Sequence, residues 1–159
     1  MTAQQDFIKR EKFLDEYETN LGLPYRSLFT VDDELQNYFV MDRSQIEKLS
    51  AKDCSVIAYR LAQYSFHMQR CINREKAMIP YAEQQLNNII AQNLESYSKF
   101  TKHDMKVASI CRENKAAEEW SRIIIWAQQR VAKLEDLAQG INNLSYRIST
   151  VQKHKEEAK

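Results

Sequence analysis

The chain has 159 residues, of which 28% are charged, two are glycine and two are proline, and its formal net charge is +1. The scarcity of glycine and proline excludes a many-stranded sheet, whose turns need these residues, and excludes the glycine-rich loops that bind phosphates. The overall charge by itself indicates no polyanionic partner. We therefore predict an all-α protein in which long helices account for most of the chain.

The charges are unevenly distributed. Residues 1–53 hold 7 basic and 11 acidic residues, whereas residues 54–159 hold 16 basic and 11 acidic residues, so an acidic front precedes a basic body. Such a distribution favours a polyanion on the body, although solvated helix faces show similar imbalances by chance. Three widely spaced cysteines, an odd number, and the lack of an apolar targeting or membrane-spanning run predict a reduced, soluble, cytoplasmic protein with no membrane partner.

Two short helices and a connector are predicted at the amino-terminal end. Residues 3–20 place apolar side chains at helical spacing and are followed by a breaker at Gly22-Leu23-Pro24. Residues 23–30 should be irregular. The run from Thr30 to Asp33 matches a capping box that opens a second helix, and residues 41–49 are expected to form a connector.

A long helix is predicted to begin at Ser50, whose hydroxyl can accept a hydrogen bond from the backbone N–H of Asp53. Its apolar residues then recur every three or four positions for more than six turns, which requires a partner helix of comparable length. Pro80 should kink or break this helix near residues 76–80, because proline lacks a backbone donor.

A second long helix is predicted from a capping-box match at Thr101-Lys-His-Asp104 to the charged tail. Gly140 within it is either a tolerated helix glycine or a local break. Two such helices joined near residues 97–101 form a long antiparallel hairpin. The predicted organisation is therefore an amino-terminal segment of short helices and connector at 1–49 and a helical hairpin at 50–159.

A nearly continuous apolar block follows in the second long helix. A two-helix hairpin buries only one face of each helix, so part of this block needs another cover. We expect a homo-oligomer whose interface includes Trp120, Ile123, Ile124, Ile125 and Trp126. The alternative is that residues 3–40 fold back and cover the block entirely.

No pattern typical of catalysis occurs, so the chain is predicted not to be an enzyme and to need no cofactor. His67 and Cys71 stand four residues apart, a spacing that suits two zinc ligands, but no second pair accompanies them. We interpret them as a packed pair rather than a metal site, and the cysteines as core residues.

The segment from Tyr97 to Lys115 interleaves basic and aromatic residues, a combination that single-strand binding proteins use. If a helix begins near residue 99, three of its lysines share one face and can neutralise successive phosphates. The candidate phosphate contacts are Lys99, Lys102, Lys106, Arg112 and Lys115, and the candidate stacking rings are Tyr97 and Phe100. The alternative is that the lysines only solubilise a hairpin tip. A second cationic patch could form from Arg70, Arg74, Arg130 and Lys133.

From Leu94 to its end the chain resembles the UvsY-type recombination mediators of T-even and related phages. The resemblance rests on Leu94-Glu-Ser-Tyr-Ser98, similar to the family's L-x-Y-Y-S segment, on Lys102-His-Asp-Met-Lys106, similar to K-x-E-M-K, and on the Trp- and Ile-rich stretch at 120–126. Leu134-Glu-Asp-Leu137 and the pattern from Ile141 to Ile148 complete it. Two positions depart from the family pattern: Ala91-Gln-Asn93 replaces basic residues, and Ser96 replaces the first aromatic.

The resemblance implies a ring-forming helical protein that wraps single-stranded DNA on a basic surface, contacts a recombinase and a single-strand binding protein, and acts in the cytoplasm of a phage-infected host. We therefore expect a non-enzymatic, oligomeric single-stranded DNA-binding protein that assists recombinase loading. The main alternative is a structural or scaffolding protein, such as a phage ring component or a small terminase-like adaptor. A third is a regulatory protein that binds a protein partner through its acidic front.

Overall fold

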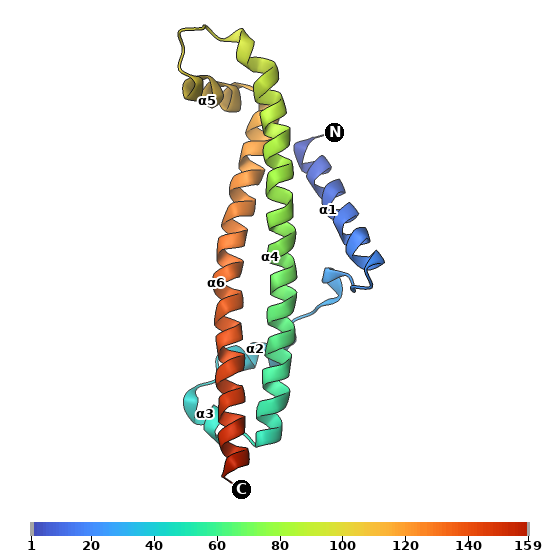
Figure 1. Ribbon diagram of the computed structural model, residues 1–159, viewed down its shortest axis with the longest axis vertical. Helices are drawn as coiled ribbons and strands as arrows, with labels where there is room; N and C mark the ends of the chain where they lie inside the picture. The colour runs from blue at the N-terminus through green and yellow to red at the C-terminus, as the bar shows by residue number, and fades with distance from the viewer. Residues whose placement is uncertain (1, 159) are drawn as a thin grey trace. The chain divides into compact units, whose positions relative to one another are not determined.

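The computed structural model describes residues 2–158, which form helices and connecting turns and contain no strand. The all-α prediction is confirmed. The helices, coloured along the chain in Figure 1, are α1 Ala3–Asn20, α2 Asp33–Phe39, α3 Arg43–Lys48, α4 Ala51–Asn93, α5 His103–Glu113 and α6 Lys115–Glu157, with short 3-10 turns at Arg26–Leu28 and Leu94–Ser96.

The chain forms two compact units, and α4 and α6 contribute to both. Unit 1 consists of residues 1–24 and 73–132, and unit 2 consists of residues 25–72 and 133–159. This grouping differs from the predicted division at residues 49 and 50. Each unit combines part of the amino-terminal region with a stretch of both long helices, because the short helices cover apolar side chains of α4 and α6.

Within each unit, α4 and α6 pack in opposite directions, as a hairpin requires. In unit 2 the Ser145 hydroxyl donates to the Ala58 carbonyl at 2.9 Å, while Ala138, earlier in α6, lies beside Ser65, later in α4, at 3.5 Å. In unit 1, Ala117 clusters with Ile90, later in α4, and Arg130 binds Glu75 near the start of the unit's α4 segment. The predicted antiparallel pairing of two long helices is confirmed.

Most helix ends follow local capping chemistry. Ser50 and Asp53 cap each other's backbone N–H at the start of α4, at 3.1 and 3.3 Å, as predicted. The second helix is present, but its cap is Asp32, which accepts from the Leu35 N–H at 2.8 Å, rather than Thr30. The expected connector at 41–49 instead contains α3, because Asp42 and Gln45 form a capping box.

Two predictions about the long helices are refined. Of the predicted kink or break at Pro80, the break is excluded, because α4 continues through this residue; Pro80 is exposed, so the missing backbone hydrogen bond lies on the solvent side, while neighbouring Met78 and Ala82 are completely buried. The second long element is divided at Asn114. This residue has extended backbone angles, ends α5, and caps α6 by accepting from the N–H groups of Ala116 and Ala117 at 3.0 and 3.2 Å. α6 continues through Gly140.

Two apolar clusters of the described residues contribute to the core of unit 1. The first brings α1, α4 and α6 together and contains Ala3, Phe7, Met78, Ala82, Trp120, Ile123 and Ile124. The second joins the end of α4 to α5 and the start of α6 through Ile90, Ile110 and Ala117. In unit 2, one cluster packs α2 against both long helices and contains Leu35, Tyr38, Cys54, Ile57, Ala58, Leu61, Ile141 and Ile148.

Candidate nucleic-acid interface

The candidate interface is the segment from Tyr97 to Lys115, which we call the basic turn. Residues 97–102 connect the 3-10 turn at the end of α4 to α5, and Asn114 separates α5 from α6. α5 is held in place by one face: Ile110 is 1% exposed, and Val107 and Cys111 pack against the same cluster. The opposite face and the loop before it are therefore left to solvent.

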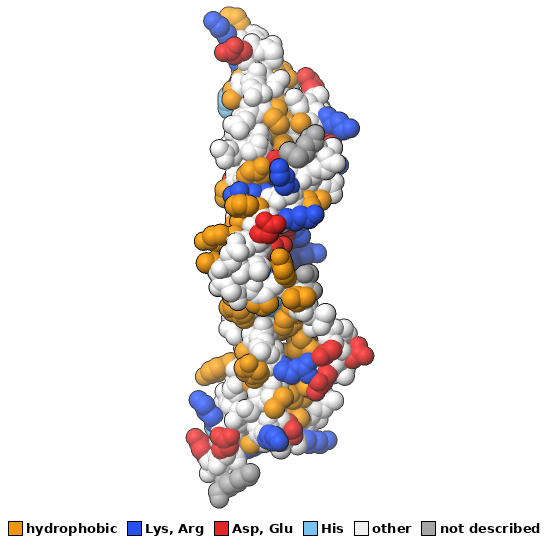
Figure 2. Space-filling view, turned by 90° about the vertical axis from the view of Figure 1, so that its right-hand side faces the viewer, with side chains coloured by type: hydrophobic (Ala, Val, Ile, Leu, Met, Phe, Trp, Pro, Cys, Tyr) orange, Lys and Arg blue, Asp and Glu red, His pale blue; other side chains and the backbone are white. Residues whose placement is uncertain are grey.

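The basic side chains of this segment are exposed or half-exposed. The prediction that Lys99, Lys102 and Lys106 share one helix face is wrong, because α5 begins at His103 and Lys99 belongs to the loop. Lys102 is the N-cap residue of α5, and its carbonyl accepts from the N–H of Lys106 at 3.1 Å, so these two lysines lie one helical turn apart. Lys99 thus lies in the loop, and Lys102 and Lys106 lie at the start of α5. Arg112 lies in the last turn of α5, and Lys115 is the first residue of α6. Figure 2 shows basic, acidic and hydrophobic side chains next to one another at the upper end, where this segment lies.

The two candidate stacking rings have different environments. Phe100 is fully exposed, and its ring is open to a planar ligand. Tyr97 packs against the cluster of Ile90, Ile110 and Ala117, and its hydroxyl donates to Glu113 at 3.0 Å. Desolvation, and then this hydrogen bond, raise the pKa of Tyr97. The Tyr97 ring thus has an intramolecular role, and its predicted role as a stacking platform stays a prediction.

Glu113 also forms an ion pair with Arg112, one of the candidate phosphate contacts. Its second carboxylate oxygen lies 3.2 Å from Arg112, so this arginine is paired on the surface. Lys99, Lys102, Lys106 and Lys115 are then the main cations of the basic turn. Its net charge, counted from residue 97 to residue 115, is +3 from five basic and two acidic residues.

The second cationic patch predicted across the hairpin does not form as such. Arg74 is 2% exposed and binds Asp15 and Glu18 of α1 at 2.9 and 2.7 Å. Arg130 makes two contacts of 2.9 Å with Glu75. Both arginines are paired within unit 1: Arg74 binds carboxylates of α1, whose position the sequence pattern did not reveal, and Arg130 binds Glu75 of α4.

The predicted oligomer interface is also changed by α1. Trp120, Ile123 and Ile124 are between 5 and 9% exposed and pack against Ala3 and Phe7. These three residues therefore belong to the core of unit 1, and their assignment as an oligomer contact is corrected. For these three residues the alternative prediction holds, because α1 of the amino-terminal region covers them.

Ile125 and Trp126 are the two members of the predicted interface that α1 leaves accessible. They are 50 and 51% exposed, respectively. They point away from the core because consecutive helix residues are rotated by about 100°.

His67 and Cys71 form a packed pair, as interpreted from the sequence. The Cys71 sulfur lies 3.7 Å from His67 Nε2, and the His67 ring stacks on Phe29 with centroids 4.4 Å apart. Burial, then the nearby Arg70 and Arg26, lower the pKa of His67. Within residues 2–158, no group of three or more His, Cys, Asp or Glu side chains is arranged to hold a metal ion.

Comparisons with protein-family models, with curated proteins and with solved structures gave no match. Among the helices of the described region, none has both the length and the apolar composition needed to cross a membrane.

Proposed function

We propose that this protein is a non-enzymatic, self-associating single-stranded DNA-binding protein that assists the loading of a recombinase. The single observation that supports DNA binding is the composition of the basic turn: five basic residues and a fully exposed phenylalanine on a segment of net charge +3. Lys99, Lys102, Lys106, Arg112 and Lys115 would contact phosphates, and Phe100 would stack on an unpaired base. The recombination role is supported by the resemblance to UvsY-type mediators.

The geometry favours single-stranded over duplex DNA. Phe100 precedes α5 on a loop and has no protein neighbour covering it, so its ring can reach the face of an unstacked base. Bases in a duplex are already stacked on each other and offer no such face. A fully exposed aromatic ring beside lysines is therefore better suited to binding single-stranded DNA than duplex DNA.

The test is the binding of a fluorescent oligodeoxythymidine followed by anisotropy at increasing salt. Affinity should fall steeply with salt, because each neutralised phosphate of a single strand contributes roughly 0.7 to the slope of log K against log salt. Replacing Lys99, Lys102 and Lys106 by alanine should weaken binding and lower this slope by about 2. The matched control replaces Lys12, Lys48 and Lys52, three exposed lysines outside the basic turn, and should leave the slope nearly unchanged.

A second variant tests the stacking ring. Phe100→Ala should weaken binding about tenfold or more without changing the salt slope, while Phe100→Tyr should retain most of the affinity. Absence of binding by the wild-type protein at low salt would contradict the proposal and favour a scaffolding function. A mediator should also shorten the lag before a strand-exchange recombinase acts on DNA coated with single-strand binding protein.

A further inference from the structure

Unit 1 has a groove between α1 and α6, with a volume of about 470 Å³, which we call the α1–α6 groove. This volume is in the range that holds a small ligand or a bulky side chain. Its apolar lining comes from Phe7, Ile8, Ile123 and Trp126. Its polar lining consists of Thr2, Gln4, Glu11, Glu75, Glu119, Arg122 and Arg130.

The groove exposes apolar surface that the fold itself does not use. Ile8 and Trp126 are 43 and 51% exposed, although Phe7 and Ile123 beside them are buried. A single exposed hydrophobic side chain is ordinary, but two that line the same concave site mark a place where an apolar group can bind. Ile8 comes from α1 and Trp126 from α6, so the site exists only because α1 is docked.

The charges of the groove select the kind of occupant. Three carboxylates and two guanidinium groups line it. Arg130 is bound to Glu75, and Arg122 lies 5.8 Å from the centre of the Trp126 ring. The lining has an excess of one negative charge, which disfavours a nucleic acid and favours an apolar side chain with cationic neighbours.

The chain has such a side chain in Phe100. It is the most exposed large hydrophobic residue among the described residues, and Lys99 and Lys102 flank it. Because it is fully exposed, it does not occupy the groove of its own chain. We propose that Phe100 of one copy inserts into the α1–α6 groove of a second copy, with the flanking lysines near the groove's carboxylates.

This inference rests on the self-association in the proposed function and supplies a contact for it. The two contacting surfaces differ, so the interaction is head-to-tail and repeats into a ring or a filament. One aromatic ring buries only about 150–250 Å², far below the roughly 1,000 Å² of a stable interface. The association should therefore be weak and concentration-dependent unless ring closure reinforces it.

The experiment is sedimentation velocity of the full chain without DNA, from about 1 µM to about 1 mM. DNA is omitted because one ring cannot stack on a base and fill the groove at the same time. The mean mass of the wild-type protein should rise with concentration. Phe100→Ala, and separately the groove variants Trp126→Glu and Ile8→Glu, should each weaken association at least about tenfold. Met105→Ala, at an exposed residue of α5, is the matched control and should associate like wild type.

Mixing the variants distinguishes this contact from a symmetric one. Phe100→Ala retains an intact groove and Trp126→Glu retains an intact Phe100, so an equimolar mixture should form dimers that cannot grow further. A mixture that remains monomeric, or Phe100→Ala protein that associates like wild type, would overturn the inference, as would a wild-type protein that is monomeric at every concentration. Circular dichroism verifies that each variant is folded.

The outcome is separable from that of the proposed function. Trp126→Glu should retain full binding to the oligonucleotide, because the groove does not belong to the basic turn. Association that depends on the groove, without DNA binding, would contradict only the DNA proposal. DNA binding without association would contradict this inference and the self-association in the proposed function, but not the DNA binding.

Discussion

Two arginines of α4, fourteen residues apart, attach the amino-terminal helices to the two units by the same chemistry but in different surroundings. In unit 1, Arg74 binds Asp15 and Glu18 of α1 and donates to the carbonyl of Glu11 at 2.8 Å. The Arg74 side chain is 1% exposed. A charge removed from water to this extent is tolerated only because all of its partners are present.

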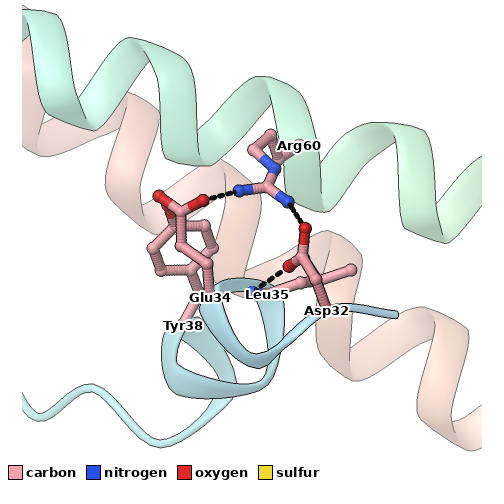
Figure 3. A network of polar contacts seen from close by, with 5 residues as sticks. All are labelled: Asp32, Glu34, Leu35, Tyr38 and Arg60. Atoms are coloured by element: carbon pink, nitrogen blue, oxygen red, sulfur yellow. Dashed lines mark hydrogen bonds and ion pairs between the residues drawn. The ribbon is translucent and has the colours of Figure 1, made fainter. Parts of the chain in front are cut away.

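In unit 2, Arg60 binds the carboxylates of Asp32 and Glu34 at the start of α2, and Tyr38 donates to Glu34 (Figure 3). The Arg60 side chain is 26% exposed, and the two carboxylates are 55 and 65% exposed. Water solvates these charges whether or not they are paired, so the network contributes little to stability.

These two networks show that the number of ion pairs does not indicate whether the attachment of a short helix, α1 or α2, depends on them. α1 buries only Ala3 and Phe7, so its position depends largely on Arg74 and on the hydrogen bond from Tyr81 to Asp6 at 2.7 Å. α2 is less than half as long as α1 but buries Leu35 and Tyr38 in the core of unit 2. We expect α1 to be sensitive to the loss of its arginine and α2 to be insensitive.

The largest expected effect comes from Arg74→Met. This change removes the buried guanidinium group that Asp15 and Glu18 bind, and the free energy of unfolding should fall by about 3–5 kcal/mol. Urea unfolding followed by circular dichroism measures the loss. Tryptophan emission should shift to longer wavelength if α1 no longer covers Trp120. The control is Arg43→Met, which breaks a fully exposed pair with Glu47 and should change little. An equal effect of both changes would contradict the comparison.

A smaller effect is expected when the partners are neutralised together. Arg74→Met combined with Asp15→Asn and Glu18→Gln removes the charges of all three side chains of this network. This triple variant should recover about 2 kcal/mol of the loss seen with Arg74→Met alone. Urea unfolding of both proteins under identical conditions gives the difference. No recovery would mean that α1 depends on the attraction itself rather than on avoiding buried unpaired charge.

A still smaller effect is expected from Arg60→Met. Its partners remain solvated and α2 remains attached by Leu35 and Tyr38, so the unfolding free energy should fall by less than about a third of the loss at Arg74. The loss should shrink further at high salt, which screens exposed pairs. A large, salt-independent loss would show that this network is as important as the buried one.

The smallest effect is the acid sensitivity of the same network. The Leu35 N–H, and then Arg60, lower the pKa of Asp32 below its ordinary 3.8, and the hydrogen bond from Tyr38, and then Arg60, lower the pKa of Glu34 below 4.5. The folded protein thus binds fewer protons than the unfolded chain, so the contribution is complete above these ordinary values and is lost as the pH falls through the lowered ones. The stability difference between wild type and Arg60→Met should therefore shrink below about pH 4. Urea unfolding at a series of pH values measures it, and a difference that grows in acid would contradict the assignment.

Several helices and helix boundaries could be predicted from local sequence patterns. The spacing of apolar residues predicted the long helices, because a stripe repeated every three or four positions has no other regular interpretation. Ser50 and Asp53 predicted the start of α4 correctly. The α3 capping box at Asp42 and Gln45, and the helix division at Asn114, used residue types that favour helix starts, so a stricter search for caps could have found both.

The geometry of the candidate sites was harder to predict from the sequence. The lysines of the basic turn were identified from composition, but their arrangement depended on α5 starting at His103, a boundary without a side-chain cap. Tyr97 and Phe100 look equivalent in the sequence, and only the packing of α5 separates a half-buried ring from an exposed one. Trp120 and Trp126 look equally apolar, yet α1 covers one and leaves the other half exposed.

The helical class, the antiparallel pairing of α4 with α6 and the basic character of the turn follow from the order of the amino acids, because periodicity, turn chemistry and charge act within short stretches. Which apolar face remains open and which arginine is buried are set by the packing of the folded chain. Both outcomes depend on α1 docking on residues more than fifty positions away, where a few long-range contacts outweigh local preference.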